Sequence, residues 1–178
     1  DLVIVEAQTR DDAIIGQLEK YGVPVLVTIG ADAKDPVKQL LATFDLIAQA
    51  TGRTERAESV TTEMKDHLAE AKKTLAAASP ASTDFVYFDG WVDGGTVSLR
   101  PFGTGSLIGA IGGELGLTNV WKGETDPAYG LGSTDIEGMT TVGSATLLYT
   151  GTDDPDSESF IKAAEKNPAW ASIPAVKE

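Results

Sequence analysis

Hydrophobic and polar residues follow each other along the chain in patterns that predict an α/β protein. Residues 2–6 (LVIVE) form a short β-branched run, which is typical of a buried parallel strand. Residues 11–22 place their apolar positions on one face of a helix, and residues 23–30 (VPVLVTIG) form a second apolar run. A strand, a helix and a strand in this order predict a βαβ unit with a parallel sheet and a right-handed crossover.

Helical periodicity dominates the next part of the chain. Asp35 is expected to cap a helix that has Pro36 at its first position. After this helix, Thr54 is expected to cap a longer one that ends near Ala78. Such a helix would be about 36 Å long, enough to run along a whole small domain. Its apolar stripe consists of Ala57, Val60, Met64, Leu68, Ala71 and Leu75.

The second half of the chain begins after residues 76–82 (AAASPAS), whose proline and small residues end the long helix. Residues 84–100 predict a β-hairpin that turns at Gly94 and Gly95. The elements expected after it are a glycine-rich helix, a polar loop at 122–133, a short helix at 133–139, a strand at 146–151 and a helix at 159–167.

Composition and charge exclude several classes of function. The 14 basic and 27 acidic residues give a net charge of −13, which would repel nucleic acid. The chain has no cysteine, so disulfides, thiolate metal sites and cysteine nucleophiles are excluded. Its apolar runs are too short to cross a bilayer. We therefore expect a packed globular protein with no nucleic-acid partner.

The glycine-rich segment 100–116 (RPFGTGSLIGAIGGELG) invites comparison with phosphate-binding loops. Gly103 and Gly105 begin a G-x-G pattern, but Ile108 stands where the dinucleotide fingerprint needs its third glycine. The lysine and hydroxyl residue of a P-loop are also absent from this segment. The loop at Gly103 and Gly105 could contact a ligand or simply form a turn, and the sequence leaves both open.

The later glycines of this segment have a structural interpretation. Gly109, Gly112, Gly113 and Gly116 have the spacing of one helical face, which predicts close backbone packing against the sheet. Gly116 is better interpreted as the C-terminal stop of the helix. Ser106 is expected to cap its N-terminus, where backbone amides could face an oxygen-rich ligand.

Nothing in the sequence supports an enzyme. His67 is the only histidine, and it falls in the middle of the long helix beside the apolar stripe. Residues 152–158 (TDDPDSE) lack the glycine and the closing glutamate of an EF-hand loop. Carboxylates are plentiful, but no pair is singled out for acid–base chemistry. We therefore expect no catalytic residue and no metal ligand.

Aromatic residues and one arginine gather at the ends of second-half elements, a pattern suited to a bulky polar ligand. They are Trp91, Arg100, Phe102 and Tyr129. Packing within the hairpin is the alternative for Trp91 and Phe102. Trp121 and Trp170 are assigned to the core.

The order of several motifs resembles that of the periplasmic binding proteins that deliver iron–siderophores and cobalamin to ABC importers. The motifs are DLVIVE, ATGRTERAES, FGTGSLIGAIGGELGLTNVWKGET, GSTDIEGM, LLYTG and NPAWASIPAVKE. The resemblance implies an α/β fold of two lobes joined by one long helix. It places a partial first lobe at 1–52, the interlobe helix at 53–79 and a truncated second lobe at 80–178, so the chain is expected to be a fragment.

The resemblance also implies roles for individual residues. Tyr129 falls where ferric-hydroxamate binders place a ligand-stacking aromatic, and Leu131 is a rival for that place because the gap is uncertain. Leu99 or Arg100 falls at a ligand-lining position after the hairpin. Glu137 matches the second-lobe glutamate that docks onto arginines of the permease.

The function implied by the resemblance is capture of a ferric siderophore, of hydroxamate rather than catecholate type, and its delivery to an ABC permease. The protein would be a monomer without a cofactor, since the siderophore itself holds the iron. It would be extracytoplasmic and lipid-anchored to the outer face of the membrane. Cobalamin or haem binding by the same fold is an alternative, as is an α/β enzyme or metal-cluster subunit on a related scaffold. The acidic charge balance favours a neutral or cationic ligand.

Overall fold

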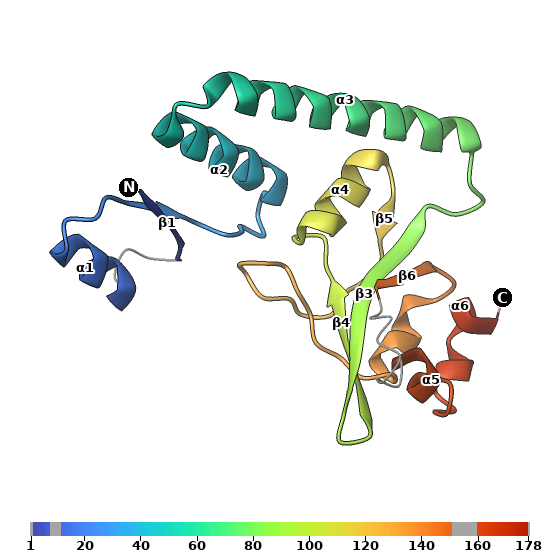
Figure 1. Ribbon diagram of the computed structural model, residues 1–178. Helices are drawn as coiled ribbons and strands as arrows, with labels where there is room; N and C mark the ends of the chain where they lie inside the picture. The colour runs from blue at the N-terminus through green and yellow to red at the C-terminus, as the bar shows by residue number, and fades with distance from the viewer. Residues whose placement is uncertain (1, 8–11, 151–159, 178) are drawn as a thin grey trace.

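The computed structural model describes residues 2–7, 12–150 and 160–177 of the chain. A small α/β unit at the N-terminal side and a larger one at the C-terminal side lie apart, and the long helix α3 runs above α2 and above α4 of the larger unit (Figure 1). We call these units the first and the second lobe. In the described part of the chain, no helix has the length and apolar character needed to cross a bilayer.

The first lobe is built on a parallel strand pair. Strand β1 (Val3–Glu6) pairs with β2 (Val25–Thr28) along its whole length, and helix α1 (Ala13–Lys20) connects them. Asp12 caps α1, since its carboxylate accepts a hydrogen bond of 3.0 Å from the amide of Ile14. The predicted βαβ unit is confirmed.

Helix α2 (Pro36–Thr51) follows the first lobe. The side chain of Asp35 accepts a hydrogen bond from the amide of Lys38 at 3.1 Å, as expected for its N-cap. Gly52 ends the helix in the left-handed region, with a φ of 67°. Both signals were readable in the sequence because capping depends on neighbouring residues only.

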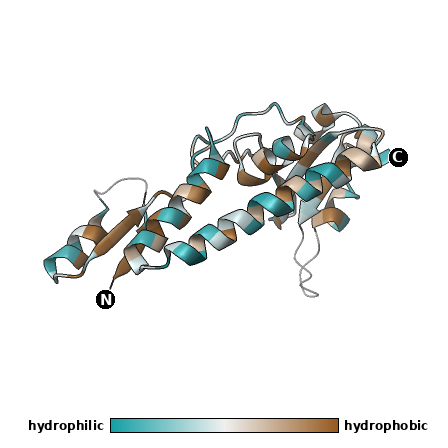
Figure 2. Cartoon of the chain, turned by 90° about the horizontal axis from the view of Figure 1, so that it is seen from above, coloured by the Kyte–Doolittle hydropathy of each residue, from teal (hydrophilic) through white to brown (hydrophobic). Residues whose placement is uncertain are grey.

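Helix α3 (Thr54–Ala78) has the expected extent, but the expected cap is wrong. Thr54 is the first helical residue, and Arg53 occupies the N-cap position without a side-chain cap hydrogen bond. No residue of α3 is buried, and the predicted apolar stripe is only partly covered by α2 and α4. Seen from above, its outer face is mostly hydrophilic (Figure 2). The helix is therefore a bridge between lobes more than part of a core.

The second lobe has a mixed sheet centred on β3 (Asp84–Asp93). Strand β4 (Thr96–Phe102) pairs with it as the predicted hairpin, turning at two glycines with φ of 56° and 85°. The short strand β5 (Thr118–Asn119) and strand β6 (Thr146–Thr150) run parallel to β3. The sheet order is β4-β3-β5, with β6 also paired to β3.

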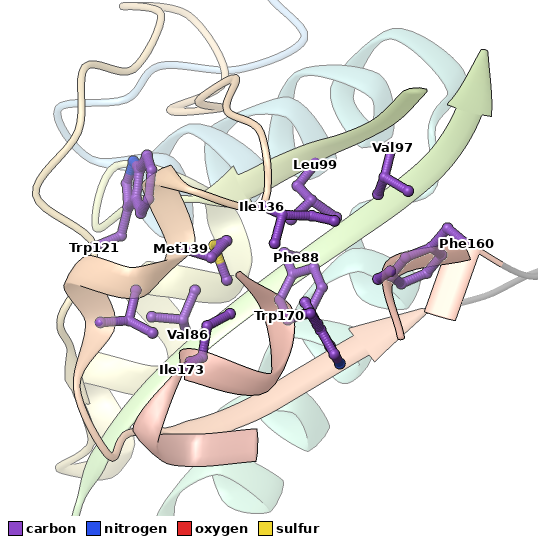
Figure 3. Packing of buried hydrophobic residues seen from close by; sticks show 12 residues of the cluster. Val86, Phe88, Val97, Leu99, Trp121, Ile136, Met139, Phe160, Trp170 and Ile173 are labelled. Atoms are coloured by element: carbon purple, nitrogen blue, oxygen red, sulfur yellow. The ribbon is translucent and has the colours of Figure 1, made fainter. Parts of the chain in front are cut away.

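One face of this sheet packs into the core of the second lobe. The side chains of Val86 and Phe88 on β3 and of Leu99 on β4 are fully buried and point into it (Figure 3). The remaining members of the cluster are Val97, Trp121, Ile136, Met139, Val142, Phe160, Ala164, Trp170 and Ile173. The core assignment of Trp121 and Trp170 is confirmed.

Short helical segments close the core on that face. They are η1 (Gly138–Val142), α5 (Phe160–Ala164), η2 (Trp170–Ser172) and α6 (Pro174–Lys177). The helix expected at residues 133–139 is wrong in its position. Leu131 and Thr134 instead form β-bridges to β4, a turn follows at 136–137, and the helical segment begins only at Gly138. The acidic segment 152–158 lies outside the described residues.

Helix α4 (Leu107–Leu115) carries the glycine stripe, and only part of the expected packing is found. A Cβ at Gly109 would collide with the carbonyl oxygen of Gly103, and one at Gly112 with the ring of Phe85. A Cβ at Gly113 would meet nothing, so the packing role expected for that glycine is wrong.

The ends of α4 are as expected. The hydroxyl of Ser106 accepts a hydrogen bond from the amide of Gly109 at 3.0 Å, which confirms it as the N-cap. Gly116 ends the helix with a φ of 94°.

Candidate functional site

A cavity of about 220 Å³ lies where the first lobe and α2 meet the second lobe. It forms beyond the carboxyl ends of β1 and β2, the place where open parallel sheets bind their ligands. Its walls are mainly apolar. The lining residues are Gly30, Ala31, Pro36, Leu40, Phe102, Ser106, Leu107, Ile108, Tyr129 and Leu131.

Local hydrogen bonds hold the first-lobe wall in place. Gln39, on the first turn of α2, donates from its side-chain amide to the carbonyl oxygen of Ile29 at 3.0 Å. The amide of Ala33 donates across the cleft to the carbonyl oxygen of Pro127, although at a long 3.4 Å. The loop after β2 is thus tied both to its own helix and to the opposite lobe.

Asp126 organises the loop that presents Tyr129. Its carboxylate accepts hydrogen bonds from the amides of Tyr129 at 2.7 Å and of Ala128 and Leu131 at 2.9 Å. The bond from the Tyr129 amide is the main cause that holds the pKa of Asp126 below its ordinary value. A charged carboxylate therefore fixes the backbone on both sides of Tyr129.

The Tyr129 side chain reaches across the cleft to the first lobe. Its hydroxyl donates a hydrogen bond of 2.6 Å to the carboxylate of Glu6, the last residue of β1. This hydrogen bond, together with the negative charge of Glu6, raises the pKa of the Tyr129 hydroxyl. Gly30 lies beneath the pair, and a Cβ there would collide with Glu6 and come within 2.9 Å of the tyrosine hydroxyl.

The second-lobe sheet turns a polar face away from its core. Arg100 lies opposite Asp89, with 3.7 Å between the guanidinium and the carboxylate, and 5.0 Å from the ring centre of Trp91. Phe102 shares this face two residues along β4 and packs edge-on against Tyr87 at 4.9 Å. Since Phe102 also lines the cavity, this face leads from the cavity along the hairpin.

The structure brings some of the expected site residues together and separates others. Phe102, Tyr129 and the rival Leu131 all line the cavity. Trp91 and Arg100 lie farther along the polar face and are both partly exposed.

Leu99 must be corrected, because its side chain is completely buried in the second-lobe core. Side chains alternate between the two faces of a strand, so the polar face of β4 presents Arg100 and not its neighbour Leu99. Leu99 therefore stabilises the lobe and does not face the cavity.

Glu137 lies at a different part of the second lobe. It is exposed at the start of η1, and its carboxylate accepts a long hydrogen bond of 3.4 Å from the side-chain amide of Asn167. It borders a wider hollow of about 780 Å³ that Asp135 also lines. We take the smaller cavity as the candidate site, because it is formed by both lobes.

Sequence reasoning missed the half of the site that the first lobe and α2 form. Glu6, Pro36 and Leu40 were not among the expected site residues, although each touches the cavity or its tyrosine. One signal for Glu6 was available: it is the last residue of a predicted parallel strand, and such ends face the ligand crevice.

Metal ligands are not grouped in the described part of the chain. No cluster of three or more histidine, aspartate or glutamate side chains there could hold an ion. Among the cavity-lining residues, only Ser106 and Tyr129 carry a polar side chain. The hydroxyl of Ser106 is already engaged, since it donates to the carbonyl oxygen of Gly103 at 2.7 Å.

Comparison with known families decides what kind of protein this is. The sequence profile described as "Periplasmic binding protein" matches residues 1–178. The chain belongs to this family. No curated protein sequence matches the chain.

Solved structures share the fold of this periplasmic binding protein. One is a siderophore-binding protein from Vibrio cholerae with bound Fe³⁺–Desferal, at 17% identity and a TM-score of 0.78, with 99% of this chain and 63% of that chain covered. Another is a triscatecholate siderophore-binding protein from Bacillus subtilis with ferri-bacillibactin, at 17% identity, a TM-score of 0.66 and coverage of 99% and 59%.

A periplasmic haem-binding protein in complex with two haems is also similar, at 16% identity, a TM-score of 0.70 and coverage of 99% and 63%. The chain thus spans less than two thirds of the length of these neighbours. What it shares with them is the fold.

Proposed function

We infer that this chain is part of the substrate-binding component of an ABC importer, and that its ligand is a ferric siderophore of the hydroxamate type. The cavity between the two lobes is the observation that carries this inference. Its lining offers one phenol, that of Tyr129, and no carboxylate, imidazole or thiolate, which is too few ligands to hold bare iron, so iron would have to arrive already coordinated. A siderophore supplies that coordination, and the protein would then need no cofactor of its own.

The remaining groups at the cleft suit an uncharged chelate with polar edges. Apolar walls would contact its backbone, and Phe102 and Tyr129 would stack on it. Arg100 would donate charge-assisted hydrogen bonds to its oxygen atoms from the polar face of the hairpin. Trp91 would support Arg100 and does not need to touch the ligand.

The cavity is smaller than the roughly 300–1,000 Å³ of typical small-molecule sites. Ligand entry would therefore require the two lobes to separate at the contact between Tyr129 and Glu6. Movement at a few loop positions is a common way for two-lobed proteins to open around a ligand.

Titration of the full-length protein tests the inference. Ferric hydroxamates, ferric catecholates and haem would be added in turn, and tryptophan fluorescence would be followed. We expect saturable quenching, tightest with a ferric hydroxamate. A preference for haem would show that the ligand is haem, bound by the same fold, and not a siderophore. An absence of saturable quenching with all three classes would sink the inference.

Delivery of the ligand would require a surface that meets the permease, and we assign Glu137 to it. Its exposed carboxylate could pair with a basic group of that partner. Glu137→Ala is expected to leave ligand affinity unchanged and to slow uptake in cells. Glu114→Ala, which removes an exposed carboxylate from α4, serves as the matched control. Normal uptake by the Glu137 variant would remove the docking role.

The rest of the assignment follows from the proposed importer role. The protein would work outside the cytoplasm, as a monomer that is lipid-anchored to the outer face of the membrane. Acylation of the full-length protein, measured by mass spectrometry, tests the anchor.

A further inference from the structure

Glu6 is a charged residue whose side chain is hydrogen-bonded to a side chain of the cavity lining. It does not line the cavity itself, but it holds the hydroxyl of Tyr129, which does. It stands at the carboxyl end of β1 and is exposed. Its carboxylate therefore faces the space that a ligand would enter.

The bond between Glu6 and Tyr129 does not neutralise the carboxylate. Tyr129 donates an uncharged hydroxyl, so the negative charge stays at the mouth of the cavity. No salt bridge to Glu6 is found among the described residues. On the polar face of the second lobe, the positive charge of Arg100 is balanced by Asp89, which lies 3.7 Å away.

The carboxylate of Glu6 already affects the ionisation of the tyrosine hydroxyl. Glu6 raises the pKa of Tyr129, first because its carboxylate accepts the hydrogen bond from the hydroxyl, and second because a phenolate beside it would place two anions together. Any other anion brought to the same place meets the same repulsion, and a cation meets an attraction of similar size.

We propose that Glu6 sets the charge class of the ligand, so that the cleft accepts cationic and neutral iron complexes and discriminates against anionic ones. This proposal rests on the proposed function, since it concerns the same cavity. It goes further by naming one residue outside the lining as the source of selectivity.

The test uses three ligands with one iron centre. Desferrioxamine B carries a pendant ammonium group, which acetylation makes neutral and succinylation makes anionic, while the three hydroxamates around the iron stay the same. Affinities of the three ferric complexes for the full-length protein would be measured by calorimetry at low salt, where charge effects are least screened.

Glu6→Gln removes the charge and keeps an oxygen that can accept the hydrogen bond from Tyr129. We expect the wild-type protein to bind the cationic complex tightest and the anionic one weakest. In the variant, the ratio between these two affinities should fall by roughly 25-fold, with roughly fivefold for each of the two units of ligand charge.

Two further variants separate charge from hydrogen bonding. Tyr129→Phe removes the bond and keeps the carboxylate, so it should weaken all three complexes by a similar factor and leave their ratio unchanged. Glu19→Gln makes the same charge change on the exposed face of α1 and should alter nothing.

The outcomes distinguish the two claims. If the wild-type protein binds these complexes but Glu6→Gln leaves their ratio unchanged, the role of Glu6 is overturned and the siderophore function stands. If the wild-type protein prefers the anionic complex, the role of Glu6 is likewise overturned. If the wild-type protein binds none of the three, the hydroxamate function fails and the role of Glu6 falls with it.

Discussion

The two lobes contribute to the cleft in different ways. The second lobe holds its side of the site on a sheet backed by a cluster of twelve buried residues. In the described residues of the first lobe and α2, the buried apolar side chains are Ile15, Val37 and Ala48. The comparison indicates that the second lobe is a rigid platform, whereas the first lobe and α2 border the cleft with a thin layer and a few polar contacts.

Truncation of a core residue in each lobe gives the largest expected effects. Phe88→Ala should lower the free energy of unfolding by about 3–5 kcal/mol, because the ring is fully buried between Phe160 and Trp170. Ile15→Ala should cost about 2 kcal/mol, since its surroundings can collapse more easily.

Chemical denaturation measured with two probes checks the difference. All three tryptophans belong to the second lobe, so their fluorescence reports on that lobe alone. Phe88→Ala should move the fluorescence transition, and Ile15→Ala should move only part of the circular dichroism signal. Coincident shifts in both variants would show that the lobes unfold as one unit, contrary to the comparison.

Adjacent glycines of α4 probe how tightly the second lobe is built. Gly112→Ala should destabilise it by about 1–3 kcal/mol, because the added methyl group would collide with the ring of Phe85. Gly113→Ala meets open space and should stabilise the helix by up to about 1 kcal/mol. Thermal unfolding of the two variants measures both changes in stability. Changes of the same sign in the two variants would contradict the packing described.

Arg100 tests whether the polar face of the second lobe takes part in binding. Arg100→Ala should weaken ferric hydroxamate binding by roughly tenfold, the size of one charge-assisted hydrogen bond, with an unchanged fold. Arg56→Ala, at an exposed position of α3, is the control. Unchanged affinity in calorimetry would leave Arg100 with no role beyond its contacts to Asp89 and Trp91.

Substitution of Asp126 should give the smallest effect. Asp126→Ala should lower the free energy of unfolding by about 1 kcal/mol, because the three amides that lose their acceptor can bond to water instead. Its pKa is lowered in the folded protein, so its stabilisation is present above the ordinary value of 3.8 and is lost as the pH falls through the folded-state pKa.

Acid unfolding curves of the wild-type protein and Asp126→Asn would reveal this contribution. The variant keeps one acceptor oxygen but cannot titrate, so the difference in stability between the two proteins should shrink as the pH falls below 3.8. A difference that stays constant with pH would show that the carboxylate charge is unimportant for the loop.

Local patterns predicted most of the fold. The βαβ unit, the caps Asp35 and Ser106, the hairpin and the extent of α3 all follow from neighbouring residues, and the structure confirms them. One failure has a tertiary cause. A helix was predicted at residues 133–139, but the bridge from Thr134 to Leu99 keeps the start of this segment extended.

The candidate site was only half predictable. Its second-lobe members, Phe102 and Tyr129, stand out as aromatics beside turns, and Leu99 was misplaced because the face of β4 depends on the exact strand register. The members from the first lobe and α2 are ordinary apolar residues, which carry no local signal of ligand contact, and Glu6, whose only signal is its place at the end of a predicted parallel strand.

The sequence alone therefore determined the elements, their caps and the family to which the chain belongs, because these depend on short-range patterning and motif order. Only the tertiary structure decided which side chains meet in the cleft. Glu6 and Tyr129 are 123 positions apart in the chain, and their hydrogen bond exists because α2 packs on α4 and the loop after β2 bonds to the opposite lobe. No periodicity encodes such a contact, since it depends on the packing of whole elements and not on their own residues.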